Sequence, residues 1–502
     1  MAKRLIPILI LICFLASCAP APASPTPPRT ATVPPTRTPH PTQTSIPTAT
    51  PYPALQTDGP YLLFTYDNRN FTIMDADGNG RKQFQLSNEG YTFQLNKSVS
   101  PDGKWLAYFT GSIKEPYDIT LNLLNLSDGT TQPISNLLAQ GFPANLEPIV
   151  ESMVLGDPPI YDSDCFQSME CRRSRVQREL VNSLFSLDWS PDSQSIAFTA
   201  QIDGPSSDIY IYDVADKTIR QLTNELLNIY KINWAPNGQR ILYEISSPLG
   251  NDSQGMEFHL VNLDGKEISF TEESLYKYLH WNGYDWIFDN LYLLFRWSDA
   301  PPHQSDFKIL NTDTGHVKDV WPHHADFFAV NKENQTIVLL FKNHHNQSSK
   351  IAEGIYMVYP SGKYWKISDV GIMFVLMEGQ KPYPIFAQDY NRRIYSISND
   401  GSINALPWAN DSVPWISPNG KWLLFRDRNE IALYTESYQP IKSWNIDVSG
   451  VIWRPDSLGI FLFMDKKLHY LSIPNGDPVV VDIHLQEDCS VQYCRFQYIW
   501  LP

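Results

Sequence analysis

The chain has 502 residues, of which 19% are charged and 13% are aromatic, and its formal net charge is −15. An acidic chain without a basic stripe is poorly suited to nucleic acid, because binding a phosphate backbone requires clustered Lys and Arg that displace counterions. We therefore expect no nucleic-acid partner. The 14 Trp and 26 Tyr favour an all-β protein with aromatic-rich strands.

Residues 1–17 have the pattern of a targeting segment. Lys3 and Arg4 precede an apolar stretch, residues 5–15, that is short for a membrane-spanning helix. The following Leu-Ala-Ser-Cys resembles the lipobox of bacterial lipoproteins, which implies cleavage before Cys18 and a lipid on that residue. An ordinary secretory signal with an incidental cysteine is the alternative. We expect an exported chain, lipid-anchored to a bacterial membrane and extracytoplasmic, on the periplasmic side or the cell surface.

Residues 18–57 form a low-complexity segment rich in Pro and Thr. Such a composition has too little apolar surface to fold and favours extended polyproline II. We expect a disordered tether that holds the remaining residues, 58–502, away from the membrane.

A short motif recurs through residues 58–502, with clear copies that begin at residues 98, 187, 232, 415 and 451. An apolar strand runs into Pro, then Asp or Asn, often Gly, and a second apolar strand follows. Proline fixes φ for a turn, Asp or Asn accepts nearby amide hydrogens, and Gly tolerates left-handed backbone. The predicted turn residues are Pro101, Asp102, Gly103, Pro191, Asp192, Pro236, Asn237, Gly238, Pro418, Asn419, Gly420, Pro455 and Asp456.

A second, weaker turn marker follows each returning strand, so that two hairpins make one four-stranded unit. The markers are Asp77-Gly78, Asp128-Gly129, Asp216-Lys217, Asp264-Gly265, Thr314-Gly315, Ser361-Gly362, Asp400-Gly401, Ser437-Tyr438 and Asn475-Gly476. Prolines 191 and 236 are 45 residues apart and prolines 418 and 455 are 37 apart, a period expected of propeller blades. Between residues 244 and 415 the motif decays, and we predict three degenerate blades with returning strands at 291–295, 336–341 and 384–387.

The two ends of the chain complete one repeat. The final Trp-Leu-Pro is the first half of the motif, and Asp-Gly-Pro-Tyr-Leu-Leu-Phe at residues 58–64 is the second half. We expect both terminal strands to share one blade and to close the ring, which removes exposed sheet edges.

The Trp-Ser-Pro-Asp-Gly type of motif, followed by an Asp-x-Asp-Gly hairpin, resembles TolB-type, WD-repeat-like β-propellers over most of residues 58–502. The resemblance implies an all-β fold: a single closed propeller of eight or nine four-stranded antiparallel blades, expected to be monomeric. Members of the TolB group are periplasmic and bind other envelope proteins, and similar blades occur as accessory domains of peptidases. This chain differs in having more repeats and a lipoprotein-like start.

An insertion of about residues 134–182 is predicted, because prolines 101 and 191 are 90 residues apart. It carries a basic run with Arg172, Arg173, Arg175 and Arg178, for which a partner-binding surface and a solvated cap are both open. Four cysteines outside the targeting segment form two close pairs, Cys165 with Cys171 and Cys489 with Cys494. Local disulfides suit an oxidising compartment, whereas neither pair has a companion at zinc-ribbon spacing.

The sequence contains no G-x-S-x-G, H-E-x-x-H or P-loop motif. The histidines of residues 303–345 are adjacent pairs or loop residues, so no metal site and no cofactor are expected. Trp189, Trp234 and Trp453 fit packing between blades better than sugar stacking. We expect a non-catalytic, membrane-anchored scaffold or binding module whose partner is an envelope or surface protein. A carbohydrate- or peptide-binding module, and a hydrolase or lyase with acidic residues in the propeller channel, are the alternatives.

Overall fold

The structure is a computed structural model that describes residues 53–86, 90–114, 117–152, 168–246, 257–270, 285–295, 307–321, 327–331, 335–341, 351–369, 372–376, 385–389, 393–398, 402–409, 414–427, 429–482 and 496–502. The predicted signal segment, the predicted lipidation site Cys18 and the predicted tether up to residue 52 lie outside these ranges, as does the marker Asp400-Gly401. The predicted end of the tether at residue 57 is too late, because the Arg81 N–H donates to the Pro53 carbonyl at 2.8 Å and the Gln56 N–H donates to Asp75 at 2.9 Å. A search of the same ranges finds no helix with the length and apolar character needed to cross a bilayer.

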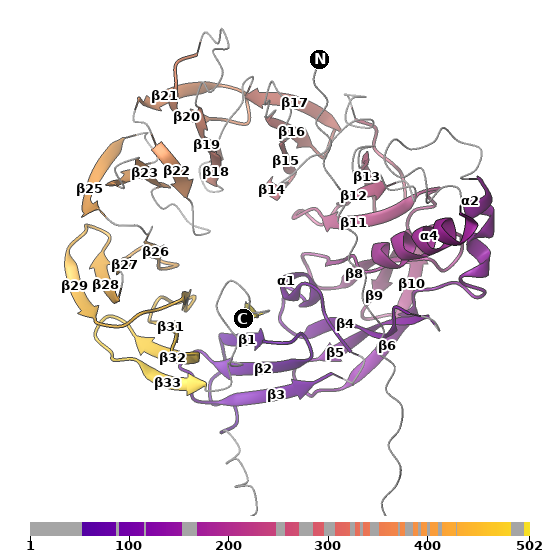
Figure 1. The fold of residues 1–502 in the computed structure, drawn as a ribbon, viewed down its shortest axis with the longest axis horizontal. Helices are drawn as coiled ribbons and strands as arrows, with labels where there is room; N and C mark the ends of the chain where they lie inside the picture. The colour runs from indigo at the N-terminus through magenta and orange to yellow at the C-terminus, as the bar shows by residue number, and fades with distance from the viewer. Residues whose placement is uncertain are drawn as a thin grey trace, which may run out of the picture. The chain divides into compact units, whose positions relative to one another are not determined.

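Nine small antiparallel sheets make up the described strands, and within a sheet consecutive strands pair with one another (Figure 1). Apolar runs at the motif copies form the central strands because they are buried on both faces. The sheets nearest the N-terminal motifs contain β4 (Trp105–Ser112), β5 (Asp118–Asn125) and β6 (Thr131–Asn136); β7 (Leu187–Trp189), β8 (Ser195–Ala200), β9 (Asp208–Asp213) and β10 (Thr218–Gln221); and β11 (Asn228–Trp234), β12 (Arg240–Ser246) and β13 (Glu257–Asn262).

The three degenerate repeats also form sheets. They contain β14 (Asp285–Phe288), β15 (Leu291–Phe295), β16 (Phe307–Asn311) and β17 (His316–Trp321); β18 (Phe327–Asn331), β19 (Thr336–Phe341), β20 (Gly354–Val358) and β21 (Tyr364–Ser368); and β22 (Ile372–Leu376), β23 (Ile385–Asp389), β24 (Arg393–Ile397) and β25 (Ile403–Ala409). Two of the predicted returning strands coincide with β15 and β19, and the third overlaps β23.

The last two motif copies form β26 (Trp415–Ile416), β27 (Trp422–Asp427), β28 (Glu430–Thr435) and β29 (Pro440–Trp444), then β30 (Gly450–Trp453), β31 (Gly459–Met464), β32 (Lys467–Ser472) and β33 (Val479–Asp482). The remaining sheet combines β1 (Tyr61–Thr65), β2 (Asn70–Asp75) and β3 (Arg81–Gln85) with β34 (Gln497–Leu501). Leu62 lies opposite Trp500 in the antiparallel β1–β34 pair, so the two terminal strands share a sheet as predicted.

Two sheets have three strands where the sequence predicted four. In the β4–β6 sheet, the segment before β4 contributes only isolated bridges, Tyr91 to Phe109 and Val99 to Leu106. The short helix α1 (Leu95–Ser98) lies between these bridges. Its Lys97 and Ser98 N–H groups donate to the Gln94 carbonyl, and its Leu95 N–H donates to the Gln497 side chain at 2.6 Å, so these amides form no ladder with a neighbouring strand. In the β11–β13 sheet, the fourth position is reduced to a single bridge, Val261 to Glu267.

A hydrophobic cluster lies between each sheet and the next along the chain. A further cluster joins the last sheet to the first, with Phe461 and Leu468 packing against Leu62 and Phe64. Small antiparallel sheets that pack face to face in this order are the blades of a known architecture. The fold is a β-propeller.

The predicted turn chemistry is confirmed at the motif copies. The Ser100 hydroxyl donates to Asp102 Oδ1 at 2.7 Å and accepts the Trp105 N–H at 3.0 Å. Gly103, Gly238 and Gly420 have φ of +71°, +75° and +73°, in the left-handed region that their turn position requires. At the weaker markers, positive φ occurs at Gly78, Gly129, Lys217, Gly265, Gly315, Gly362 and Tyr438.

Turns of neighbouring sheets also contact one another. Ser193, with φ of +62°, replaces the turn glycine, and its hydroxyl accepts the Asp102 N–H from the preceding sheet at 3.0 Å. Ser457 repeats this arrangement with the Asn419 N–H, also at 3.0 Å. At Gly103 a Cβ atom would lie 2.7 Å from Pro502 Cδ, so the first turn has no room for a side chain.

The insertion is helical where the structure describes it. It contains η1 (Ala144–Leu146), α2 (Glu147–Ser152) and α4 (Met169–Ser183). Leu146 and Val150 pack against Val176 and Leu180 of α4, which gives the insertion its own small core. The predicted start at residue 134 is too early, because β6 continues to Asn136, which pairs with Thr120 of β5.

Candidate binding site

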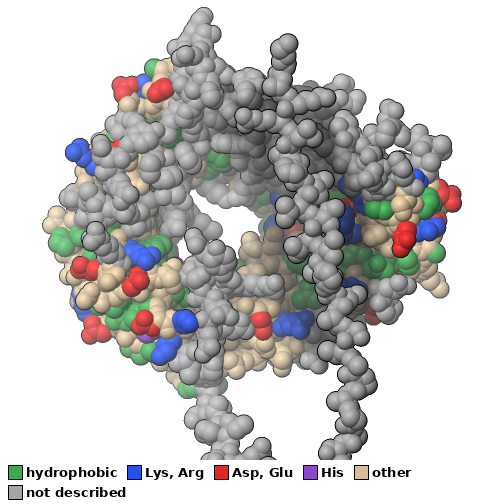
Figure 2. All heavy atoms as spheres, viewed as in Figure 1, with side chains coloured by type: hydrophobic (Ala, Val, Ile, Leu, Met, Phe, Trp, Pro, Cys, Tyr) green, Lys and Arg blue, Asp and Glu red, His purple; other side chains and the backbone are tan. Residues whose placement is uncertain are grey.

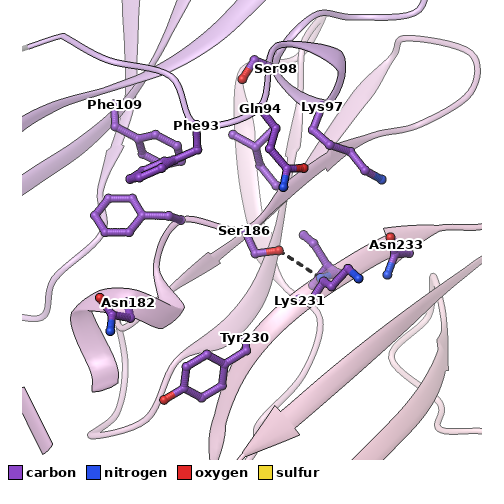
Figure 3. Close-up of a pocket in the computed structure, with 13 residues that line it drawn as sticks. Phe93, Gln94, Lys97, Ser98, Phe109, Asn182, Ser186, Tyr230, Lys231 and Asn233 are labelled. Atoms are coloured by element: carbon purple, nitrogen blue, oxygen red, sulfur yellow. Dashed lines mark hydrogen bonds between the residues drawn. The ribbon is translucent and has the colours of Figure 1, made fainter. Parts of the chain in front are cut away.

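A cavity of about 430 Å³ lies where the β4–β6, β7–β10 and β11–β13 sheets meet (Figure 3). The residues before and within α1 form one side, the end of α4 and the segment after it form another, and β11 forms a third. Its lining consists of Phe93, Gln94, Lys97, Ser98, Phe109, Asn182, Phe185, Ser186, Leu187, Tyr230, Lys231, Ile232 and Asn233.

One wall of the cavity is aromatic. The ring centroid of Phe93 lies 4.6 Å from that of Phe185, and Phe185 lies 5.2 Å from Phe109 in an edge-on contact. Phe93 is 46% exposed, so the neighbouring rings hold it while part of its surface remains open. Tyr91 packs beside this group, and burial raises the pKa of its hydroxyl to about 12, so it stays neutral.

Across from the aromatic wall, Lys97 of the lining belongs to an ion pair that joins three elements. Lys97 Nζ of α1 lies 2.6 Å from Asp188 Oδ2 of β7, and the same oxygen accepts the Trp234 N–H of β11 at 2.8 Å. Burial raises the pKa of Asp188, and the attraction of Lys97 only partly opposes it. The carboxyl of Asp188 therefore fixes α1 against β11.

Two further contacts join β11 to α4 and to the adjacent strand β12. The Tyr230 hydroxyl donates to Glu179 Oε2 of α4 at 2.8 Å, and burial together with the Glu179 charge raises the pKa of Tyr230. Lys231 Nζ lies 3.7 Å from Oε1 of the buried Glu244. Glu179 thus links the insertion to the cavity, and both lysines of the lining have carboxylate neighbours.

Asn233 differs from the other polar residues of the lining. Its side chain is 8% exposed, and its Nδ2 has no hydrogen-bond partner among the residues that the structure describes. A buried donor without an acceptor is costly and is rarely retained without a reason. In Figure 3, Asn233 and Lys97 lie on one side of the cavity and the Phe93 and Phe109 rings on the other.

The predicted arginine surface is not formed as one exposed patch. Arg172 is buried, with 9% of its surface exposed, and Arg173 pairs with Glu147 at 2.5 Å, whereas Arg178 keeps 64% of its side chain exposed. Acidic side chains lie among the basic ones around α2 and α4 (Figure 2). The arginines differ in exposure because the helical periodicity of α4 directs successive side chains toward different sides of the helix.

Other predicted residues are placed as follows. Cys171 is disulfide-bonded. Cys165, Cys489 and Cys494 lie outside the described ranges, so the pairing stays a prediction.

Trp189 and Trp234 pack between sheets as predicted, and Trp189 Nε1 donates to the Ser98 carbonyl at 3.0 Å. Within the described ranges, no three His, Cys, Asp or Glu residues lie close enough to hold a metal ion.

The cavity itself was not predicted from the sequence, although a signal for it exists. The signal is the residue that stands three positions before the turn proline. It is polar in the three motif copies whose sheets surround the cavity and apolar in the last three copies along the chain. The polar set is Ser98, Asp188 and Asn233, and the apolar set is Trp415, Ile452 and Ile499.

Comparison with known proteins gives a likeness in fold only. No family model and no curated protein matches the chain. A structure of a eukaryotic initiation factor is similar at a TM-score of 0.50 and 11% identity, over 88% of this chain and 99% of that chain. The β-propeller domain of the trilobed protease from Pyrococcus furiosus aligns at 0.32 and 12% identity, over 78% and 98%. TolB from Acinetobacter baumannii aligns at 0.25 and 15%, over 76% and 62%.

Proposed function

We propose that this chain is a non-catalytic binding module, exported and held at a bacterial membrane by a lipid on Cys18, with the Pro/Thr-rich segment before residue 53 as its tether. The cavity lined by Phe93 and Asn233 carries the proposal. It combines a partly exposed aromatic ring with a buried amide donor that has no partner in the described structure. Concave sites with aromatic walls and a few placed polar groups are the usual form of ligand sites.

The charged groups around the cavity support binding over turnover. Asp188 is engaged by Lys97 and by the Trp234 N–H, and Glu179 accepts the Tyr230 hydroxyl. A general base needs a lone pair directed at a substrate proton. Contacts that already occupy these carboxylates favour a role in holding the shape of the cavity.

We also infer that the nine sheets are the blades of one closed propeller. A hydrophobic cluster joins each sheet to the next, and the cluster of Leu62 and Phe461 joins the last sheet to the first. The β1–β34 pair supports the same inference, since it ties both ends of the chain into one blade. A closed ring would hold the three sheets of the cavity in fixed positions, as a preformed site requires.

An envelope or surface protein that binds the insertion is the second candidate partner. The exposed Arg178 of α4 favours it, because an exposed cation suits an acidic protein surface. The end of α4 lines the cavity, but Arg178 is not among the lining residues, so crosslinks from positions 93 and 178 can distinguish the two candidates.

Site-specific photo-crosslinking in native membranes tests the binding function. A benzophenone amino acid is placed at Phe93 in the full-length lipidated chain, at Arg178 for the second candidate, and at Tyr498, which is 44% exposed, as a matched control. We expect a discrete adduct from position 93 and none from position 498. Equal adducts at both positions, or none at position 93, would count against the cavity. An adduct from position 178 alone would favour the second candidate.

The membrane anchor is tested by Cys18→Ser. The variant should lose incorporation of labelled fatty acid and should no longer sediment with membranes. If the variant keeps the label, the lipid is attached to another residue.

A further inference from the structure

We infer that the cavity binds a neutral carbohydrate, with one pyranose ring lying on the side chain of Phe93. This inference rests on the proposed binding function and names the ligand class of the same site. Charge, hydrogen-bonding groups and size each bear on it.

The charges of the cavity are balanced. Lys97 is 2.6 Å from Asp188, and Lys231 is 3.7 Å from the buried Glu244. An anionic ligand would have to compete with these carboxylates and would meet their repulsion. A neutral ligand with many hydroxyl groups avoids this cost.

The polar groups of the cavity match hydroxyl groups. Gln94, Asn182 and Asn233 each present an amide, which offers a donor and an acceptor on one group, as a sugar hydroxyl does. Asn233 Nδ2 is the most specific of these, since it is buried and has no partner among the described residues. A hydroxyl oxygen that accepts from it would satisfy a donor that the protein leaves unsatisfied.

The aromatic wall suits the C–H face of a sugar ring. Phe93 is 46% exposed and is held from behind by Phe185 and Phe109. The face of an aromatic ring is negative, so it attracts the weakly positive C–H groups of a pyranose while both lose contact with water. Phe93 stands across the cavity from Asn233 (Figure 3). One sugar ring could therefore contact the Phe93 ring and the Asn233 amide together.

The size of the cavity favours a small ligand over a folded partner. Its volume of about 430 Å³ falls in the range of small-molecule sites. A stable protein partner buries about 800 Å² of each surface, which extends far beyond such a cavity. A short neutral peptide has a similar size to a short glycan, and the experiment separates the two.

Isothermal titration of the full-length chain in detergent is the test. The probes are neutral tetrasaccharides of glucose, N-acetylglucosamine, galactose and mannose, a uronate tetrasaccharide, and a neutral tetrapeptide containing Phe. The site variants are Phe93→Ala and Asn233→Leu. Their controls are Tyr498→Ala and Asn404→Leu, which change an exposed aromatic residue and an exposed Asn on strands outside the cavity. If a site variant does not fold, Asn233→Ala replaces Asn233→Leu and Phe93→Leu replaces Phe93→Ala.

We expect at least one neutral tetrasaccharide to bind, with a Kd that rises about tenfold or more in each site variant and less than about twofold in the controls. The uronate should bind more weakly than its neutral counterpart. No binding by any neutral tetrasaccharide, or binding that survives both site variants, would overturn the carbohydrate assignment.

The two proposals fail in different ways. If the tetrapeptide binds and the sugars do not, or if the crosslink at Phe93 yields a protein, the carbohydrate assignment falls and the binding function stands. If position 93 yields no adduct and no probe binds, both fall.

Discussion

The sheets around the cavity and the sheets of β26–β33 share a turn but differ at one strand position. In both groups a serine hydroxyl donates to the residue after proline, from Ser100 to Asp102 at 2.7 Å and from Ser417 to Asn419 at 2.9 Å. Three residues before the turn proline, the first group has polar residues, such as Asp188, and the second has Trp415 and Ile452. The turn and the apolar strands are therefore shared by the two groups, and the residue at this position is polar in the sheets around the cavity and apolar in the sheets of β26–β33.

If the framework is equivalent in the two groups, removing a buried side chain at the same motif position should strongly lower the free energy of unfolding in each. Phe198 of β8 and Leu462 of β31 follow their turns at the same position, and both are fully buried. We expect Phe198→Ala and Leu462→Ala each to lower the free energy of unfolding by about 3–5 kcal/mol, measured by urea denaturation. A loss near zero at either position would break the equivalence.

Exchanging the variable position should affect the two groups differently. Asp188→Ile introduces the residue type of Ile452 and leaves Lys97 and the Trp234 N–H without their acceptor. We expect a loss of about 2 kcal/mol, because an amide and a partly exposed ammonium lose a partner. Ile452→Leu is the control and should cost less than about 1.5 kcal/mol. Should Asp188→Ile prove neutral in the same denaturation measurement, the ion pair would not be holding α1 to β11.

Removing the hydrogen bond between neighbouring turns should lower the free energy of unfolding by the same small amount in the two groups. Ser193→Gly and Ser457→Gly each remove a hydroxyl that accepts an amide hydrogen from the preceding sheet. Because glycine suits the positive φ at both positions, the expected loss is only about 1 kcal/mol, from the hydrogen bond. The decrease in Tm of each variant measures this loss. Unequal decreases would mean that the two contacts are not equivalent.

Acid should weaken only turns that contain Asp. The Ser190 hydroxyl and the Gln194 N–H lower the pKa of Asp192, so this carboxylate stabilises the fold above its unfolded pKa of about 4 and loses that contribution as pH falls through its folded pKa. The effect should be below about 1 kcal/mol. Urea denaturation from pH 7 to pH 3 should show a smaller acid loss for Asp192→Asn than for the unaltered chain. Identical pH profiles would contradict the assignment. The turn of Asn419 has no carboxylate at this place.

Local patterns were enough to predict much of the propeller. The degenerate strands β15 and β19 were located because a spacing of about one blade survives where the motif does not. The pairing of β1 with β34 followed from two half motifs at the chain ends. By contrast, α1 lies where a fourth strand was predicted, and the sequence did not show that α4 buries Arg172 while Arg173 and Arg178 stay exposed.

By itself the sequence determined the β-propeller fold and the turn chemistry and narrowed the repeats to eight or nine, because each of these depends on interactions between residues close in the chain. Only the tertiary structure decided which side chains form a site. Phe93, Phe185 and Asn233 are far apart in the sequence. They line one cavity because the segment before α1, the segment after α4 and β11 lie together. Burial also decided which donor lacked a partner, since the environment of the Asn233 amide depends on every element around it.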